Sequence, residues 1–356
     1  MMSFAQWGNA LYAGDKSYPI VPNRKIFVGV SGAIVLLSFV LMAVLGIQRS
    51  IEFTGGSQFT VVGSAVTTQQ IAVDAVKGTG LASEVKVSNV GTDGIRVQTE
   101  SLSSADTATV RDALAKAYEV PATDIQSSSI GPSWGKDVTW KAAQSLVIFL
   151  TLVAALMAVY FRSWTMAASA IIALVHDIVV TVGFFSLLHV EISPATVIGF
   201  LTILGYSLYD TVVVFDKVRE LTRDIDEQKR YTFAELVNLA VNQTMVRSIN
   251  TSVVALLPVG AILVIGSLLL GAGTLTDISL ALFIGMIAGT YSSIFIASPL
   301  LVIFEEMRGR RRAHDELVAA ERTRHGHTTD EPVRVAPVVP GRRLGNENQP
   351  KRKGHR

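Results

Sequence analysis

Cysteine is absent from this chain of 356 residues. Its absence excludes disulfide bonds, thiolate catalysis and cysteine-based metal sites, so any part outside a membrane must fold on its own hydrophobic core. Charge is also sparse, because 17% of the residues are Asp, Glu, Lys or Arg, whereas 49% are hydrophobic. The hydrophobic residues fall into long blocks, which is typical of a membrane protein with several spans.

Six segments are long enough, and poor enough in charge, to cross a membrane as α-helices. We expect them at residues 26–47, 142–161, 165–188, 194–215, 248–270 and 278–304. The first segment is too long for the core of a signal peptide and no small-residue cleavage site follows it. It is therefore expected to remain as an anchor, with the other five forming a membrane domain over residues 142–304.

Lys and Arg are missing from two short connections, 189–193 and 271–277. The connections on the other side of the predicted membrane carry them, and such residues gather on the cytoplasmic face. These basic residues are Arg24, Lys25, Arg162, Lys217, Arg219, Arg223, Lys229, Arg230 and Arg247. The pattern predicts cytoplasmic termini, a cytoplasmic N-terminal segment (1–25) and a helical or amphipathic cytoplasmic connection (about 217–246).

Basic residues also dominate the end of the sequence, where residues 307–356 hold 13 Lys or Arg against 6 Asp or Glu. The prolines in this region argue against a folded domain; they are Pro332, Pro337, Pro340 and Pro350. We predict that residues 305–356 form a disordered cytoplasmic tail that is attracted to anionic lipid or ribosomal RNA, without a specific nucleic-acid site.

Residues 48–141 have the composition of a soluble domain outside the membrane. Their hydrophobic periodicity predicts the order strand, helix, strand, strand, helix, strand. The strands are expected at 52–62, 84–90, 95–99 and 124–130, and the helices at 67–77 and 104–118. A Gly-Thr-Asp-Gly turn at 91–94 and a helix start at 103–106 support this order. It is typical of a ferredoxin-like α+β domain, with another small α+β fold as the alternative.

Asp210 lies inside the fourth predicted span. An ionised carboxylate in hydrocarbon costs about 2.5–3.5 kcal/mol even on lenient scales, so such a group usually faces a partner, a cavity or a proton path. Gly199, Thr202, Tyr206 and Asp210 recur at helical spacing and predict a small and polar stripe that faces protein. Asp210 would lie about 10 Å inward of Lys217. A fixed hydrogen bond or salt bridge is the alternative to a titrating role.

Arg247 begins the fifth predicted span at a matching depth, and Asn250 and Thr251 follow it at helical spacing. We expect Arg247 to approach Asp210 and to complete a proton relay with Asp210 and Thr251. A residue that only fixes topology and extends its charge to the membrane surface is the alternative for Arg247.

Further polar and small residues extend this predicted seam. Gly285 and Gly289 have the GxxxG spacing that suits close helix contact, and Ser292 and Ser293 follow them. In the third span, Asp177 is expected to be structural, with Thr181 one turn away as its partner and the adjacent His176 pointing elsewhere around the helix. No metal or cofactor is expected.

Gly55 and Gly56 lie where the chain leaves the first span and begins the external domain. Glycine permits positive φ and close backbone approach, so a simple turn or bulge explains the pair. We also predict that the pair acts as a hinge, and that a side chain at Gly56 would impair motion while leaving the stability of the domain nearly unchanged.

Several motifs together resemble the SecF branch of the SecD/SecF family, protein-export subunits within the resistance-nodulation-division (RND) superfamily. The motifs are EFTGG at 52–56, His176-Asp177, GYSLYDTVVVFDKVRE at 205–220, NQT at 242–244 and RSINTS at 247–252. The resemblance covers about residues 24–304. The family usually has Asn where Tyr209 stands and Arg where Lys217 stands, and neither departure removes the carboxyl of Asp210.

The resemblance implies an RND half-transporter in the cytoplasmic (inner) membrane. It implies pairing with SecD beside the SecYEG channel, with YajC and a YidC-type insertase as further candidate partners. The pair would use the proton-motive force to pull exported polypeptides outward, with H⁺ as the coupling ion and Na⁺ as the alternative. The sequence has six predicted spans and no internal repeat, so it would supply one half of such a transporter. A second six-span half is therefore implied.

Two other functions fit parts of the pattern. An RND-type exporter of a solute or lipid would share the proton relay, but the external domain has no large insertion for a drug pocket. An intramembrane aspartyl protease would need Gly-x-Gly-Asp on the next span, which is missing. His-Glu-x-x-His and phosphate-loop motifs are also missing, so we do not expect an enzyme.

Overall fold

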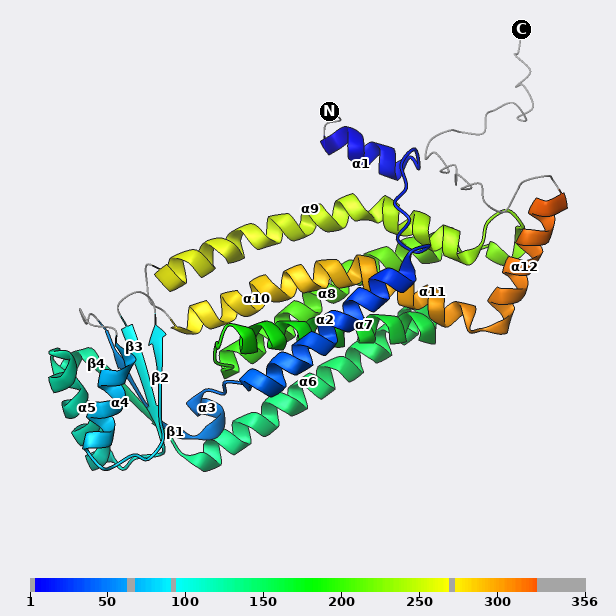
Figure 1. Cartoon of the computed structure of the whole chain (residues 1–356). Coiled ribbons are helices and arrows are strands. Elements are labelled where there is room, and N and C mark those ends of the chain that lie inside the picture. The colour runs from blue at the N-terminus through cyan, green and yellow to red at the C-terminus, as the bar shows by residue number, and fades with distance from the viewer. Residues whose placement is uncertain (1–3, 63–67, 91–93, 269–272, 325–356) are drawn as a thin grey trace, which may run out of the picture.

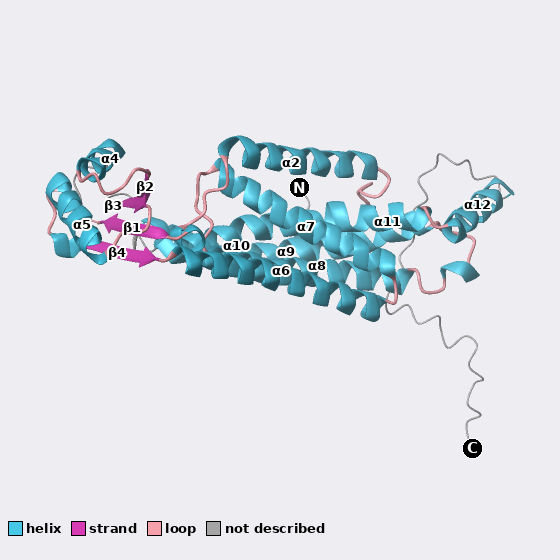
Figure 2. Cartoon of the chain, turned by 90° about the horizontal axis from the view of Figure 1, so that it is seen from below, coloured by secondary structure: helices cyan, strands magenta, loops and turns pink. Residues whose placement is uncertain are grey.

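The computed structural model describes residues 4–62, 68–90, 94–268 and 273–324. A bundle of long helices carries a small sheet domain at one end and short helices at the other (Figures 1 and 2). Within the described ranges, six helical segments are long and apolar enough to cross a membrane, which confirms the predicted fold class. They are α2 (Arg24–Leu45), α6 (Pro132–Phe161), α7 (Trp164–Leu187), α8 (Pro194–Leu221), α9 (Phe233–Leu268) and α10 (Gly273–Ser292), the last continued by a π-helical segment (Ser293–Ala297) and α11 (Ser298–Glu306).

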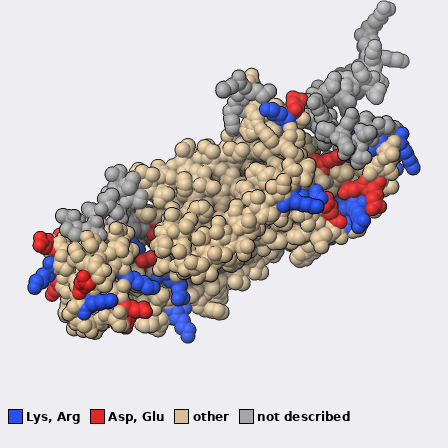
Figure 3. Space-filling model, in the orientation of Figure 1, with Lys and Arg blue, Asp and Glu red and all other residues tan. Residues whose placement is uncertain are grey.

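The third, fourth and sixth spans form the centre of the bundle. Of the residues in the most apolar stretch of each span, 56% are buried in the third and sixth spans and 44% in the fourth. In each of the other three spans, 11% are buried. The face in Figure 3 shows a broad band almost free of Lys, Arg, Asp and Glu, and these charged residues gather towards the two ends. This distribution suits a bilayer, because apolar side chains face lipid and charged side chains lie beyond it.

Several helices extend beyond the apolar stretches that predicted them. α6 begins at Pro132 rather than 142, and α9 begins at Phe233 rather than 248. Much of the predicted connection 217–246 is therefore helix, with a short 3₁₀ turn (Ile225–Glu227) between α8 and α9. The difference arises because hydropathy marks the part of a helix that lies in hydrocarbon, whereas backbone hydrogen bonding continues past it.

The small sheet domain beside the helical bundle, called the external domain after its predicted position, has the predicted ferredoxin-like order. Its elements are α3 (Ile51–Thr54), β1 (Gly56–Val61), α4 (Gln69–Gly78), β2 (Val85–Val90), β3 (Gly94–Thr99), α5 (Ser104–Tyr118), a 3₁₀ turn (Ala122–Asp124) and β4 (Ile125–Ile130). The antiparallel sheet has the order β2-β3-β1-β4. Phe59, Ile95 and Val97 of the sheet are fully buried against Val76 of α4 and Leu114 of α5. This core explains how the domain folds without disulfide bonds.

The start of the domain differs from the prediction. Residues 52–54 belong to α3 rather than to the first strand, because the chain must turn between α2 and the sheet. At the start of α5, Ser103 accepts a hydrogen bond from the backbone N–H of Asp106, which fits the predicted helix start. Residues 91–93 of the predicted hairpin turn lie outside the described residues.

Gly55 and Gly56 have φ angles of +76° and +135°. A Cβ on Gly55 would lie 2.8 Å from Cα of Pro132, and one on Gly56 would lie 2.5 Å from the carbonyl oxygen of Thr99 in β3. Both positions therefore need glycine for local packing. A side chain at Gly56 would disturb the β1–β3 pairing itself, so the expectation that it would spare the stability of the domain does not fit this geometry.

Two short helices lie at the end of the bundle opposite the sheet domain (Figure 1). α1 (Phe4–Tyr12) packs on α9, and the chain after it is held by hydrogen bonds between Tyr18 and Asn242. α12 (Gly309–Arg324) is also ordered, with Val318 fully buried and Arg322 paired with Glu235 at 2.7 Å. The prediction of disorder from residue 305 on is thus wrong for α11 and α12, and residues 325–356 lie outside the described part.

The connection between α7 and α8 contacts the external sheet. Glu191 accepts hydrogen bonds from Arg96 at 3.3 Å and from Gln98 at 2.9 Å. Backbone hydrogen bonds join Ile192 to Gln48 and to Ser50, on the segment between α2 and α3. The external domain is therefore fixed to the loop that leads directly into α8.

Candidate functional site

Asp210 lies at the centre of the bundle, with only 6% of its surface exposed. Ser248 of α9 donates a hydrogen bond to Oδ1 at 2.6 Å, and Ser293 of the π-helical segment donates to Oδ2. The carboxyl group is thus held between three helices by two hydroxyl groups. The expectation that Asp210 faces protein rather than lipid agrees with this burial.

Asp177 of α7 is a second carboxyl group in the same polar centre and is fully buried. Its Oδ2 accepts hydrogen bonds from Ser207 of α8 at 2.6 Å and from Ser292 of α10 at 2.9 Å. Nδ1 of His176 lies 3.1 Å from its Oδ1, so His176 does not point elsewhere as expected. Thr181 donates to the backbone carbonyl of Asp177 and not to its carboxyl group.

Hydrogen-bonded caps fix the starts of α7 and α8, the two helices that carry these carboxyl groups. Ser193 and Thr196 form a capping box at the start of α8, with Pro194 in its first turn. Ser163 accepts a hydrogen bond from the backbone N–H of Met166 at the start of α7. Both helices then run unbroken through the bundle, which fixes the depth of Asp177 and Asp210.

Small residues allow α10 to approach α8 closely. A Cβ on Gly285 would lie 2.8 Å from Cδ1 of Ile203, and one on Gly289 would lie 2.8 Å from Cβ of Ser207. The GxxxG spacing therefore does face α8, and it brings Ser292 and Ser293 within reach of the two carboxyl groups.

The buried face of α8 shares Gly199 and Asp210 with the predicted stripe but not Thr202 or Tyr206. Thr202 is exposed and donates to the carbonyl oxygen of Ile198, and the hydroxyl of Tyr206 finds no hydrogen-bond partner in the described part of the chain. The face that packs inside runs through Gly199, Ile203, Ser207 and Asp210. Both series obey helical spacing, so periodicity alone cannot choose between them.

Arg247 does not contact Asp210 in this structure. Its guanidinium donates to the hydroxyl of Tyr209 at 3.1 Å, and its side chain is exposed. Consecutive residues point about 100° apart around a helix, so when Ser248 faces Asp210, Arg247 must face another way. The predicted contact between Arg247 and Asp210 is therefore not made, and the adjacent Ser248 contacts Asp210 instead.

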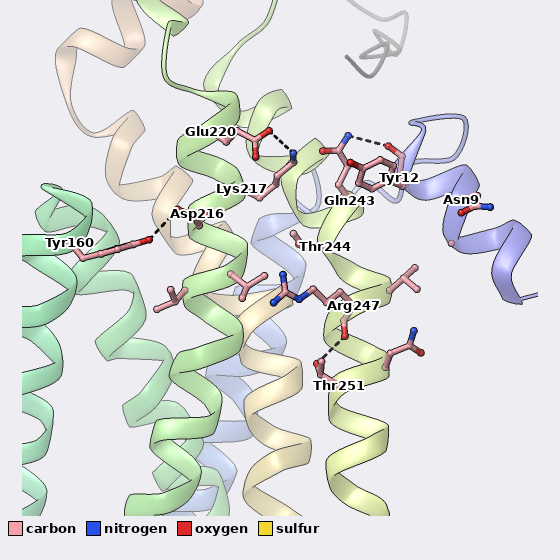
Figure 4. Close-up of a pocket in the computed structure, with 15 residues that line it drawn as sticks. Asn9, Tyr12, Tyr160, Asp216, Lys217, Glu220, Gln243, Thr244, Arg247 and Thr251 are labelled. Carbon is pink, nitrogen blue, oxygen red and sulfur yellow. Dashed lines mark hydrogen bonds and ion pairs between the residues drawn. The ribbon is translucent and has the colours of Figure 1, made fainter. Parts of the chain in front are cut away.

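Arg247 lies instead in a groove of about 940 Å³ between α8, α9 and α1 (Figure 4). Asn250 and Thr251 also line the groove, and the hydroxyl of Thr251 donates to the backbone carbonyl of Arg247. Lys217 and Glu220, which also line the groove, form an ion pair at 2.8 Å. The three residues expected as a relay therefore divide between two places, with Asp210 in the bundle and Arg247 and Thr251 in the groove.

The electrostatic setting of the two carboxyl groups is unusual. Among the described side chains, no Lys or Arg forms an ion pair with Asp177 or Asp210, and His176 is the one basic group in contact. The described residues also bring together no group of three His, Cys, Asp or Glu that could hold a metal. Hydroxyl groups can donate to an ionised carboxylate and can accept from a protonated one, so the contacts of both sites are compatible with either form of the carboxyl group.

Sequence reasoning placed Ser292 and Ser293 in the polar seam but missed two other serines of this site, Ser207 and Ser248. Both contact the carboxyl groups, but serine is common in membrane helices and carries no charge signal. One available signal was position, because Ser207 lies one turn from Asp210 and Ser248 lies beside Arg247.

The fold and this site define a multi-pass membrane protein with ionisable groups buried in its helical bundle. Residues 109–307 match the family model described as protein export membrane protein SecD/SecF, C-terminal. The protein translocase subunit SecF of Streptomyces coelicolor is 42% identical over 99% of this chain and 97% of its own length. SecF of Mycobacterium tuberculosis is 44% identical over 88% of this chain and 72% of its own. The chain belongs to the SecF family of protein translocase subunits.

A solved structure supports the same relationship. The crystal structure of SecDF from Thermus thermophilus, described as a translocon-associated membrane protein, is 28% identical with a TM-score of 0.74. The match covers 82% of this chain and 39% of the SecDF chain. This chain therefore corresponds to less than half of that larger protein.

Proposed function

We propose that this Sec translocase subunit works with SecD to drive polypeptide export through SecYEG with the proton-motive force. The observation that carries the proposal is Asp210, a buried carboxyl group with two hydroxyl donors and no basic ion-pair partner among the described residues. Such a group in a membrane helix is a functional-site candidate by its cost alone. Its protonation is the step that we assign to energy coupling, with H⁺ as the coupling ion and Na⁺ as the alternative.

Protonation would change the contacts that hold α8, α9 and the π-helical segment together. An ionised carboxylate accepts from both Ser248 and Ser293, whereas a carboxylic acid must donate one of its hydrogen bonds. A membrane potential supplies about 2.3 kcal/mol per elementary charge per 100 mV, which exceeds the net value of about 0.5–1.5 kcal/mol for one hydrogen bond. Proton entry can therefore repack α8, whose outer end leads to the Glu191 contact with the external sheet.

The exposed side of the α8–α9 groove supports a partner half. Ser248 contacts Asp210, so the adjacent Arg247 lies at nearly the same depth, about 10 Å inward of Lys217. An exposed guanidinium at that depth is costly in lipid, so we assign this face to contact with protein. SecD is the partner that the single-chain SecDF relative suggests, and RND-type transporters are built from two such halves.

The same proposal sets the orientation in the inner membrane. Both termini and the α8–α9 connection would lie in the cytoplasm, and residues 48–141 would lie outside, where an emerging polypeptide could be reached. Anionic lipid would bind the basic tail, and YajC and a YidC-type insertase are further candidate partners. An enzymatic role is not part of this proposal, because the relatives named above are translocase subunits.

The test of this function is Asp210→Asn, which keeps the shape of the side chain and removes its titration. Membrane vesicles that contain SecD, SecYEG and this chain would be loaded with a half-exported polypeptide, and its completion would be followed after a proton gradient is imposed. We expect the gradient-driven rate to fall at least about tenfold, which corresponds to about 1.4 kcal/mol. Asp137→Asn, at an exposed position near the start of α6 and outside the groove, is the control and should behave like the wild type. Gradient-driven export at the normal rate in Asp210→Asn would refute the proposal.

A further inference from the structure

Asp177 is as enclosed as Asp210, yet the proposed function gives it no part. The carboxyl group is 0% exposed and accepts from hydroxyl groups on two other helices, Ser207 of α8 and Ser292 of α10. A carboxyl group used only for packing could be replaced by an uncharged residue at lower cost, because an ionised group in this setting is expensive. The side chain beside it, His176, is also buried and can carry a proton.

The hydrogen bonds of His176 leave room for one exchangeable proton. Its Nδ1 lies 3.1 Å from Oδ1 of Asp177, and its Nε2 is buried with no hydrogen-bond partner in the described residues. A neutral imidazole with its proton on Nδ1 would donate to an ionised Asp177, and the pair would carry one negative charge. After uptake of one proton the pair is neutral, either as carboxylic acid and imidazole or as carboxylate and imidazolium. The pair can thus take up one proton on either of its two members.

The two carboxyl groups are close enough to influence each other. Ser207, which donates to Asp177, precedes Asp210 by three residues on α8, which is about 4.5 Å along the helix axis. The two carboxyl groups are thus separated by one serine side chain and about one turn of α8, and ionised carboxylates in such an arrangement in a protein interior repel each other and titrate as a pair. No Lys or Arg in the part of the chain that the structure describes is ion-paired with either of them.

The other helices around Asp177 add little charge. α10 contributes Tyr291, whose ring centroid lies 6.3 Å from that of His176 and whose hydroxyl is hydrogen-bonded to Ser31 of α2. α11 contributes Glu305, which is hydrogen-bonded to Thr165 at the start of α7, three turns of helix from Asp177. Asp210 is therefore the ionisable group on a neighbouring helix that the contacts connect most directly to Asp177.

The π-helical segment provides that connection. Ser292 and Ser293 are consecutive, yet they donate to different carboxyl groups, Ser292 to Asp177 and Ser293 to Asp210. Each hydroxyl also has a second acceptor on its own helix, the carbonyl oxygen of Gly289 at 3.2 Å or of Thr290 at 3.1 Å. When a carboxylate takes up a proton, its serine can turn to this carbonyl. π-Helical turns of this kind are frequent at functional sites because they displace side chains from the regular helical positions.

We propose that Asp177 and His176 form a second proton-binding site, coupled to Asp210 through Ser292 and Ser293. This inference deepens the proposed function, since it rests on proton binding at Asp210 as the first site. Proton uptake at one carboxyl group favours release at the other, because the pair avoids holding two negative charges and both serines move with one helical segment. Coupling thus arises from repulsion through space and from the shared segment together.

Infrared difference spectroscopy tests the proposal on the full-length chain in liposomes. Spectra taken between acidic and alkaline buffer report the carbonyl stretch of each carboxyl group that gains a proton. We expect two buried carboxyl bands in the wild type, one lost in Asp210→Asn and the other in Asp177→Asn. Of the two bands, the one that titrates at higher pH in the wild type should move to lower pH when the other carboxyl group is removed, because its charged neighbour is gone. Asp137→Asn, at an exposed position of α6, should leave both bands unchanged.

Variants that keep both carboxyl groups provide an independent measurement. Ser207→Ala removes a donor to Asp177 only, so the Asp177 band alone should shift in frequency and in titration midpoint. Ser293→Ala should shift the Asp210 band first, and His176→Gln should shift the Asp177 band. Unchanged bands in Ser207→Ala and His176→Gln, or midpoints of both bands that stay the same when the other carboxyl group is removed, would overturn the proposal. Absence of the Asp210 band, with the Asp177 band present, would instead count against the proposed function.

Discussion

Gly289 shows how a single hydrogen atom decides the geometry of the buried site. A methyl group there would lie 2.8 Å from Cβ of Ser207 and 3.5 Å from Oδ2 of Asp177. α10 can therefore approach α8 only because no side chain intervenes, and the serines that follow Gly289 depend on that approach.

We expect Gly289→Ala to destabilise the membrane domain by about 1–3 kcal/mol, the usual cost of overpacking. Thermal unfolding of the purified chain in detergent, followed by circular dichroism, would measure the change. Gly32→Ala is the control, because this exposed glycine of α2 has no atom within 4 Å of an added Cβ. Equal melting temperatures for the two variants would contradict the packing argument.

At this scale the sequence placed Asp210 correctly in the protein interior but not its partners. Arg247 was the predicted partner because its charge is opposite to that of a carboxylate, yet Ser248, one position later, makes the contact. Helical spacing predicts which residues face a neighbouring helix only to within about one position. The choice between adjacent residues depends on the rotation of the helix about its axis, which tertiary packing sets. The roles of Arg247 and Thr251 in proton transfer stay predictions.

Elements were easier to predict than contacts, and the exceptions are instructive. Long apolar runs identified all six spans, and period-two patterns identified the four strands, because both signals come from burial within one element. α12 was missed because its composition is highly charged and typical of disorder. Its order comes from partners elsewhere in the chain, chiefly Glu235, which no local pattern can show.

The docking of α12 leads to a prediction about neighbouring residues. Val318 is fully buried, whereas the adjacent Leu317 is 54% exposed. Val318→Asp should release α12 from the α8–α9 connection, because a buried, unpaired carboxylate is costly. Leu317→Asp should leave it in place. Trypsin would then cleave within α12 at least about tenfold faster in Val318→Asp, since proteolysis follows the population of the open form. Similar cleavage rates in the two variants would contradict this docking.

The whole molecule carries its charge at two ends, and the absence of cysteine makes the orientation of those ends easy to test. A cysteine introduced at an exposed position would be the only thiol in the chain. We expect Thr123→Cys in the external domain to react with a membrane-impermeant maleimide in intact cells. Asp224→Cys, between α8 and α9, should react only after the membrane is opened. Labelling of Asp224→Cys in intact cells would reverse the proposed topology.

The continuity of α8 has a mechanical consequence. This helix of 28 residues is unbroken from Pro194 to Leu221, so it forms a rigid rod about 42 Å long. A tilt of only about 5° about one end would displace the other by about 4 Å by simple geometry. That displacement is larger than the 3.3 Å that separates Arg96 from Glu191, just before the start of the rod. A rearrangement too small to open a channel in the bundle would therefore still be enough to pull the external domain away from its resting contact.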